Sequence, residues 1–163
     1  MRHTFRRRPF VALGLAIAAI GFTPAVAWAS VPGSTADVNT DTQMVALHGY
    51  DTVAYFTDGH PVKGDARFMV DYHGVHYDFA SQNHADKFRA DPAAYLPQFG
   101  GFCAIGTSYG QKVDIDPLSW RIVDGKLYLN FDPSVQKLFN KDVPGTISRA
   151  DGQWPKIKGD KAH

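Results

Sequence analysis

The stretch that decides the fold is Arg67-Phe-Met-Val-Asp-Tyr-His-Gly-Val-His-Tyr-Asp-Phe79. Two runs of β-branched and aromatic residues flank His73-Gly74, and a two-residue turn needs a positive φ, which glycine adopts freely and histidine tolerates. Pairing outward from the turn brings six hydrophobic residues onto one face in three cross-strand pairs: Tyr72 with Val75, Val70 with Tyr77, and Phe68 with Phe79. The pattern predicts a half-buried β-hairpin over residues 67–79.

A second hairpin is predicted over residues 120–131, where Asp124-Gly125 is a stronger turn signal. Its register places four residues on the buried side: Trp120, Ile122, Leu127 and Leu129. The wetter side receives Arg121, Val123, Lys126 and Tyr128.

Short helices fill the segments around the hairpins. Ser81 is a good N-cap for a helix over residues 82–90, and Asp132 with Pro133 opens another helix. A further short helix is predicted between residue 144 and Trp154. Two hairpins packed with short helices predict a small single domain of the α+β class.

The first 29 residues have the three parts of a secretory signal peptide. Four arginines precede an apolar run, and Ala27-Trp28-Ala29 follows as a cleavage pattern. Because a membrane-spanning helix needs roughly 20 apolar residues, we expect the leader to be removed and no membrane span to remain. The expected location is periplasmic or secreted. Arg7-Arg8-Pro9-Phe10 also resembles a twin-arginine signal, so both export routes stay open.

The net charge of the 134 residues that follow the leader limits the classes of binding partner to be expected. Four of the 17 Lys and Arg residues lie in the leader, so 13 remain against 16 Asp and Glu, a net charge of −3. The absence of a basic cluster argues against a nucleic-acid partner and leaves a small molecule or a metal ion. Residues 30–43 predict a flexible tether, residues 44–155 the domain, and residues 156–163 a polar tail.

The segment between residues 77 and 95 resembles the YHS domain. It matches the family pattern in order and spacing at Phe79, Ser81, Phe88, Pro92 and Tyr95. Two flanking segments look like an exported bacterial branch of that family: Gly49-Tyr-Asp-Thr-Val-Ala-Tyr-Phe56 and Pro97-Gln-Phe-Gly-Gly-Phe-Cys-Ala104. In some members of that branch selenocysteine replaces the residue corresponding to Cys103.

The YHS domains that this segment resembles are generally regarded as metal binders, but that property does not carry over to this chain with the resemblance. The family's ligands are cysteines, one of them in a Phe-Cys-Ser motif. This chain has Ala80 in that place and no early cysteine motif at residues 47–51. The usual ligand set is therefore absent, and the resemblance implies no particular reaction.

Cys103 is the one cysteine of the chain, so it cannot form an intramolecular disulfide. It follows Gly100-Gly101-Phe102, and glycines let a backbone pass close to a ligand. A helix beginning near Phe102 would lower the thiol pKa and favour the thiolate. A thiolate suits redox chemistry or a soft metal ion such as Cu(I), whereas a small, buried, inert cysteine is the alternative.

The histidines are the other candidates for a site. His48 would act as a base or a second metal ligand if it met Cys103 in space. His84, in the first turn of its predicted helix, is ambiguous between a structural and a pocket position. A three-ligand set of His76, His84 and Cys103 is disfavoured, because the hairpin register pairs His76 with Asp71 on the polar face. Asp51 is explained as an N-cap.

Three functions remain open at this point. The leading one is an exported binding protein that holds a copper-like soft metal ion or a small ligand. Its expected site residues are Cys103, Gly100, Gly101, Phe102, His48 and Tyr50, with Cys103 and His48 as the metal ligands. The second is an enzyme that uses Cys103 in thiol or peroxide chemistry with a partner thiol. The third is a structural or interaction module with an inert thiol, so the sequence does not decide whether the protein is an enzyme.

Overall fold

The computed structural model describes residue 34 and residues 37–160, and the predicted signal peptide lies outside this part of the chain. The elements follow one another in the order η1 (Leu47–Gly49), α1 (Ala54–Thr57), β1 (Asp65–Tyr72), β2 (Val75–Phe79), α2 (Gln82–Ala90), α3 (Pro92–Tyr95), η2 (Gln98–Gly101), α4 (Ala104–Ser108), β3 (Asp116–Val123), β4 (Lys126–Asn130), α5 (Pro133–Lys141) and α6 (Val143–Ile157). Among the described residues, no helix is both long and apolar enough to span a membrane.

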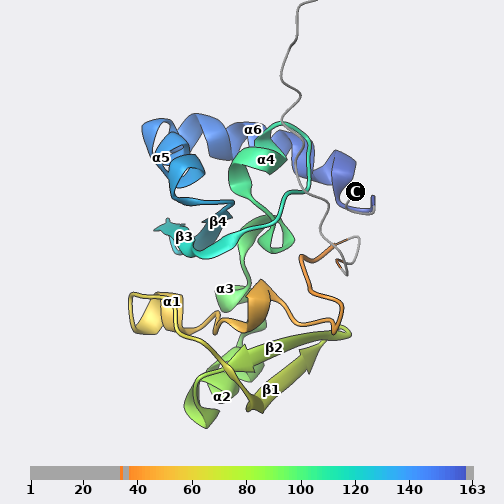
Figure 1. Ribbon diagram of the computed structural model, residues 1–163, viewed down its shortest axis with the longest axis vertical. Helices are drawn as coiled ribbons and strands as arrows, with labels where there is room; N and C mark the ends of the chain where they lie inside the picture. The colour runs from red at the N-terminus through yellow and green to blue at the C-terminus, as the bar shows by residue number, and fades with distance from the viewer. Residues whose placement is uncertain (1–33, 35–36, 161–163) are drawn as a thin grey trace, which may run out of the picture.

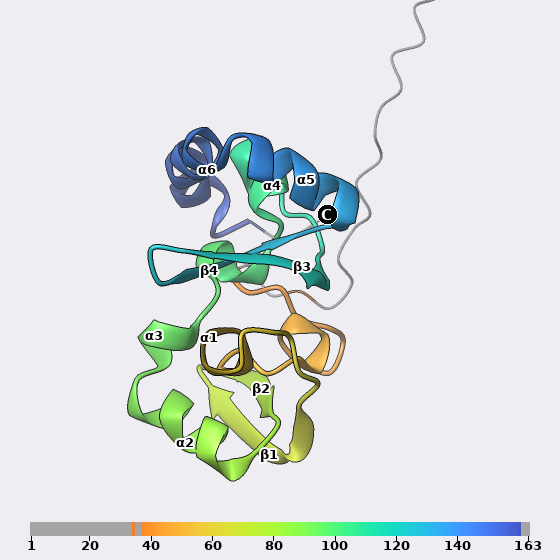
Figure 2. The same cartoon turned by 90° about the vertical axis from the view of Figure 1, so that its left-hand side faces the viewer.

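The elements form two lobes stacked along the long axis of the molecule (Figures 1 and 2). The first lobe, residues 44–96, holds η1, α1, the β1–β2 hairpin, α2 and α3. The second lobe, residues 97–157, holds η2, α4, the β3–β4 hairpin, α5 and α6. One hydrophobic core runs through both lobes, from Phe79 and Phe88 in the first to Leu127 and Phe139 in the second. The chain is therefore a small α+β domain with two separate two-stranded antiparallel sheets, as the sequence predicts.

The predicted register of the first hairpin is confirmed near its turn. Tyr72 pairs with Val75, and Val70 pairs with Tyr77. Further out the prediction is wrong, because a bulge between Asp65 and Val70 leaves Phe79 opposite Asp65. The Asp65 carboxylate accepts the backbone N–H of Arg67 at 2.9 Å, and this local loop takes up the additional residues.

The second hairpin follows its predicted register in all four pairs nearest the turn: Trp120–Leu129, Arg121–Tyr128, Ile122–Leu127 and Val123–Lys126. Both turn residues have positive φ, 50° at Asp124 and 70° at Gly125, as a primed turn requires. The side expected to be wetter is partly covered, however. Tyr128 is buried between Phe99 and Phe139, because α5 and η2 pack over it.

The helix caps are also those that the sequence predicts. The Ser81 hydroxyl accepts the backbone N–H of His84, and the Asp132 carboxylate accepts two N–H groups at the start of α5. Helix α6 extends to Ile157, beyond the predicted end of the domain. Part of the predicted tether is packed rather than flexible, since Asn39 and Thr40 are buried. The packed chain therefore begins earlier and ends later than expected.

Candidate functional site

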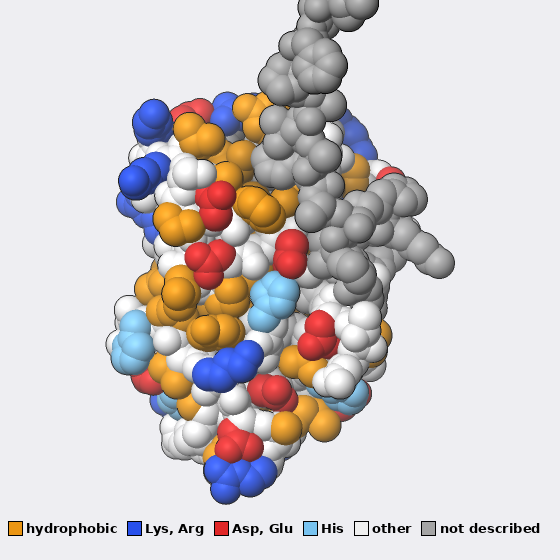
Figure 3. Space-filling model, in the orientation of Figure 1, with side chains coloured by type: hydrophobic (Ala, Val, Ile, Leu, Met, Phe, Trp, Pro, Cys, Tyr) orange, Lys and Arg blue, Asp and Glu red, His pale blue; other side chains and the backbone are white. Residues whose placement is uncertain are grey.

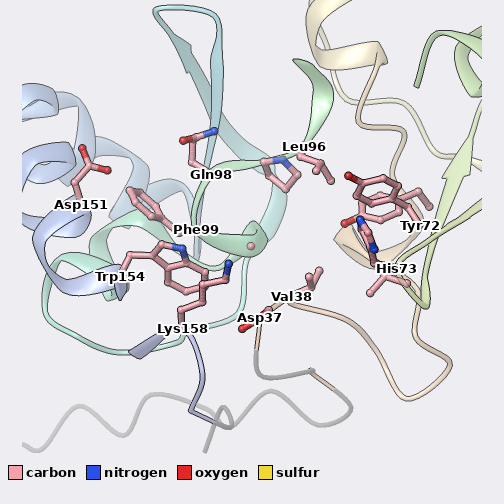
Figure 4. A pocket seen from close by; sticks show the side chains of 14 residues that line it. Asp37, Val38, Tyr72, His73, Leu96, Gln98, Phe99, Asp151, Trp154 and Lys158 are labelled. Atoms are coloured by element: carbon pink, nitrogen blue, oxygen red, sulfur yellow. The ribbon is translucent and has the colours of Figure 1, made fainter. Parts of the chain in front are cut away.

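A cavity of about 770 Å³ lies between the two lobes. Figure 4 shows Tyr72 and His73 on one wall and Phe99, Trp154 and Lys158 on the other. Its full lining is Asp37, Val38, Tyr72, His73, Val75, Tyr77, Leu96, Pro97, Gln98, Phe99, Gly100, Asp151, Trp154 and Lys158. A hollow of about 300–1,000 Å³ with mainly apolar and aromatic walls and a few polar groups is typical of a small-molecule site.

The walls of the cavity follow from the pairing of the first hairpin and from packing in the second lobe. Val75 and Tyr77 alternate along β2, so both face the same side of the hairpin. Across the cavity, the rings of Phe99 and Trp154 lie 6.2 Å apart, centroid to centroid. An aromatic surface from each lobe therefore faces a common space.

Beside the cavity, the lobes are joined by a hydrogen-bonded cluster around Asp114. The His48 ring lies 2.9 Å from the Asp114 carboxylate, and the Asn39 amide donates to the same oxygen at 3.0 Å. Asn39 also donates to the Gly101 carbonyl, and its backbone N–H donates to the Gly100 carbonyl. This cluster connects the first lobe to the wall of the cavity at Gly100.

The electrostatics of this cluster favour a charged pair. The hydrogen bond to Asp114 raises the pKa of His48 above its ordinary value of 6.5. Burial alone would raise the pKa of Asp114, but the hydrogen bonds from His48 and Asn39 outweigh it and leave that pKa lowered. The pair carries opposite charges over a mildly acidic range.

Two turns of left-handed backbone meet at this junction. Leu47, His48 and Gly49 all have positive φ, and so do Phe99, Gly100 and Gly101. A Cβ atom added at Gly100 would lie 2.0 Å from the carbonyl oxygen of Asp37, so glycine is required there by contact as well as by φ. The expected close backbone approach at Gly100-Gly101 is present, but its partner is the chain at Asp37.

Cys103 is fully buried, with 0% of its surface exposed. Its sulfur accepts the backbone N–H of Gly106 at 3.4 Å and donates to the Asn130 side-chain oxygen at 3.8 Å. Helix α4 begins just after it, as expected, but the predicted lowering of the thiol pKa is wrong. Burial raises the pKa of Cys103 and outweighs the hydrogen bonds that act in the opposite direction.

The structure does not bring the expected site residues together around the sulfur. His48 binds Asp114 rather than Cys103, and Tyr50 lies under the Lys63 ammonium at 5.0 Å. Gly100 lines the cavity, whereas Phe102 is fully buried against Trp154. His48 and Gly100 therefore lie at the junction of the lobes, whereas Cys103 is buried within the second lobe.

A second buried group ties together the first lobe. Asp51, with no exposed side-chain surface, lies 2.6 Å from the ring of His84. One of its oxygens accepts the N–H groups of Val53 and Ala54, which confirms its capping role, and the other accepts that of Ala80. The ring nitrogen of His84 that faces Asp51 therefore has a structural role. Both oxygens of the Asp51 carboxylate already accept hydrogen bonds.

Comparison with known protein families identifies a YHS domain at residues 53–99. This segment runs from the start of α1 to η2, so it covers most of the first lobe and one edge of the cavity. Searches of curated proteins and of solved structures return no match. The chain thus contains a YHS domain, and most of the second lobe lies outside the matched residues.

A metal-binding role is generally attributed to YHS domains, and the residues of this chain can be tested for their fit to a metal ion. Among the described residues, no group of three or more His, Cys, Asp or Glu side chains lies close enough to hold one. Ala80 offers no ligand atom, the Asp51 oxygens are taken by four donors, and His48 lies in a different cluster from Cys103. The donor set of this chain does not fit a resident metal ion.

Several residues of the cavity and of the cluster beside it lie beyond what the sequence indicated. Trp154 and Asp151 come from α6, which the sequence showed only as a short helix. Asp114 comes from a loop, and it carries no motif that would distinguish it. The sequence contains one indication of the cavity, the common face of Tyr72, Val75 and Tyr77. That pattern predicts that this face of the hairpin is buried, but it does not identify the segment that packs against it.

Proposed function

We propose that this protein is an exported small-molecule-binding protein whose YHS domain supplies one wall of the ligand cavity. The observation that carries this proposal is the hollow of about 770 Å³ with aromatic side chains from both lobes. The leader pattern at residues 1–29 supports a periplasmic or secreted location. The partner is then a small organic molecule that meets the protein outside the cytoplasm.

The cavity supports binding better than Cys103 supports thiol chemistry. A catalytic or metal-binding cysteine must be accessible as thiolate, and Cys103 is fully buried with a raised pKa. The cavity, by contrast, presents flat rings and a few hydrogen-bonding groups such as Gln98. Such walls bind molecules with an aromatic or compact apolar part, because ring contacts add to the free energy of apolar burial.

Binding of a neutral aromatic compound to the mature protein tests the proposal. With 4-phenylbutan-1-ol as the probe, isothermal titration calorimetry is expected to show saturable binding. Trp154→Leu removes a cavity wall and is expected to weaken that affinity about tenfold. Trp120→Leu is the matched control, since Trp120 packs against Tyr55 outside the cavity, and it should leave the affinity within about twofold.

Circular dichroism of both variants separates loss of binding from loss of fold. A wild-type protein that shows no saturable binding of the probe would overturn the proposal. So would equal weakening by the two substitutions, because the cavity would then have no special part in binding.

A further inference from the structure

A second hollow lies next to the cavity. It measures about 330 Å³ and is lined mainly by apolar side chains of the β3–β4 turn and α6: Val123, Asp124, Val143, Pro144, Ile147, Ser148 and Asp151. Asp151 lines both hollows, so its carboxylate stands at their boundary. A ligand that occupied both hollows would lie beside Asp151.

The charges along this path are mostly negative. Carboxylates of Asp37, Asp124 and Asp151 line the two hollows, and Lys158 is the lining residue that carries an ammonium group. None of the three acids forms a salt bridge with a described residue. His73 adds positive charge on the far wall only when it is protonated.

Two neighbouring groups show how charge is distributed beside the cavity. Lys112 does not line either hollow; its ammonium is held by the backbone carbonyls of Lys158 and Asp160, lies 5.7 Å from the centroid of the Trp154 ring and interacts electrostatically with Asp37. Burial, followed by the negative charges of Asp151 and Asp124, raises the pKa of Tyr128. The two carboxylates therefore act on the same small region beside the cavity.

Figure 3 shows that both signs of charge are spread over one face of the molecule. Acidic side chains lie on its upper and lower parts, and Lys and Arg side chains lie at its upper left, in its lower middle and at its bottom edge. The negative charge relevant to a ligand is therefore that of the residues lining the two hollows.

From these observations we infer that the ligand is an amphiphilic organic amine. Its aromatic part lies between the walls of the larger hollow, its ammonium group lies beside Asp151, and an apolar arm enters the smaller hollow. Aromatic rings also attract a cation through their faces, so the walls and the carboxylates favour the same charge. This inference rests on the proposed function and narrows it to one chemical class.

Three probes of nearly equal size test it by calorimetry at pH 7: 4-phenylbutylamine, 4-phenylbutan-1-ol and 4-phenylbutanoate. The amine is expected to bind about fivefold more tightly than the alcohol, and the acid more weakly than either. In Asp151→Asn the preference for the amine over the alcohol should fall to about twofold or less. Asp86→Asn, an exposed residue of α2, is the matched control and should keep the full preference.

The smaller hollow has its own test. N-Butyl-4-phenylbutylamine carries an additional apolar arm and should bind about threefold to tenfold more tightly than 4-phenylbutylamine. Ser148→Trp fills the smaller hollow from an exposed position and should abolish that gain.

The outcomes separate the inference from the proposed function. Saturable binding of the alcohol with equal affinity for the amine, or an amine preference that survives Asp151→Asn, would overturn the inference and leave the binding function standing. Failure of all three probes to bind would overturn both.

Discussion

At the scale of single residues, Cys103 shows how burial decides the chemistry of a thiol. Its sulfur contacts a backbone N–H and the side chain of Asn130, which is itself fully buried. Asn130 in turn donates to Gln136 at 2.8 Å. The sulfur is one end of a polar chain that crosses the second lobe, so its contribution is to hold α4 and β4 together.

We therefore expect Cys103 to be unreactive in the folded protein. Iodoacetamide at pH 8 should alkylate it at least about a hundredfold more slowly in buffer than in 8 M urea, because the native thiol is shielded and its pKa is raised. Mass spectrometry of the intact protein measures both rates. Comparable rates in the two solvents would instead show that the thiol is accessible in the folded protein.

The sequence correctly indicated a helix start and close-packed glycines beside Cys103, since both are local features. It could not indicate the pKa, because desolvation depends on residues far along the chain. Val113 accepts the backbone N–H of Cys103 and Asn130 contacts its sulfur. The dipole of a helix of five residues acts on the thiol more weakly than its removal from water.

At the scale of elements, the Asp51 clamp fixes three segments of the first lobe. Its carboxylate joins the start of α1, the end of β2 and the first turn of α2 through four hydrogen bonds. Each donor would otherwise be left without a partner in a buried region, which is costly.

Replacement of this carboxylate should destabilise the whole domain. We expect Asp51→Asn to lower the free energy of unfolding by about 2–4 kcal/mol, since an amide NH₂ would face groups that are themselves donors. Urea denaturation at pH 7 gives the value. The exposed Asp86→Asn serves as control and should change stability by less than about 0.5 kcal/mol; a similarly small change for Asp51→Asn would contradict the clamp.

The two hairpins show which strand pairs can be predicted from local sequence and which cannot. Turn chemistry and alternation fixed the pairs nearest each turn, and those pairs are confirmed. The pairing failed at Phe79, where β1 is drawn away by contacts with a distant segment. There the Gly64 N–H donates to the Gly49 carbonyl, and Tyr50 pairs with Lys63. A bulge caused by such a contact leaves no pattern within the strand itself.

At the scale of the whole molecule, the pair of His48 and Asp114 links the lobes in a manner that depends on pH. A raised histidine pKa contributes stability that is complete below about pH 6.5 and is lost as the pH rises through the folded value. A lowered aspartate pKa contributes stability above about pH 3.8 that is lost on acidification. The contribution of the pair is therefore greatest between these limits.

We expect His48→Gln to reduce the free energy of unfolding more at pH 5.5 than at pH 8.5. The difference should be about 0.5–1 kcal/mol, a modest value because water screens a pair in which the histidine is 40% exposed. Urea titrations at the two pH values measure it. In an Asp114→Asn background the effect of His48→Gln should no longer depend on pH, and a persistent dependence would assign it to another group.

The arrangement of the lobes could not be predicted from the chain, although the class of fold could. Hairpins and short helices follow from local patterns, whereas the cavity needs β2 and α6 to lie opposite each other over a long stretch of sequence. The pair of His48 with Asp114 likewise spans 66 positions. Contacts of that kind are set by the packing of the common core.

The approach of Gly100 to Asp37 limits how this protein can be divided into fragments. The backbone around Asn39 packs on the second lobe, although it precedes the segment that matches the YHS family. Excising residues 53–99 alone would remove both this support and the neighbouring core residue Leu47. A peptide with those boundaries should remain largely unfolded, and the smallest autonomous unit runs from about residue 37 to the last turn of α6.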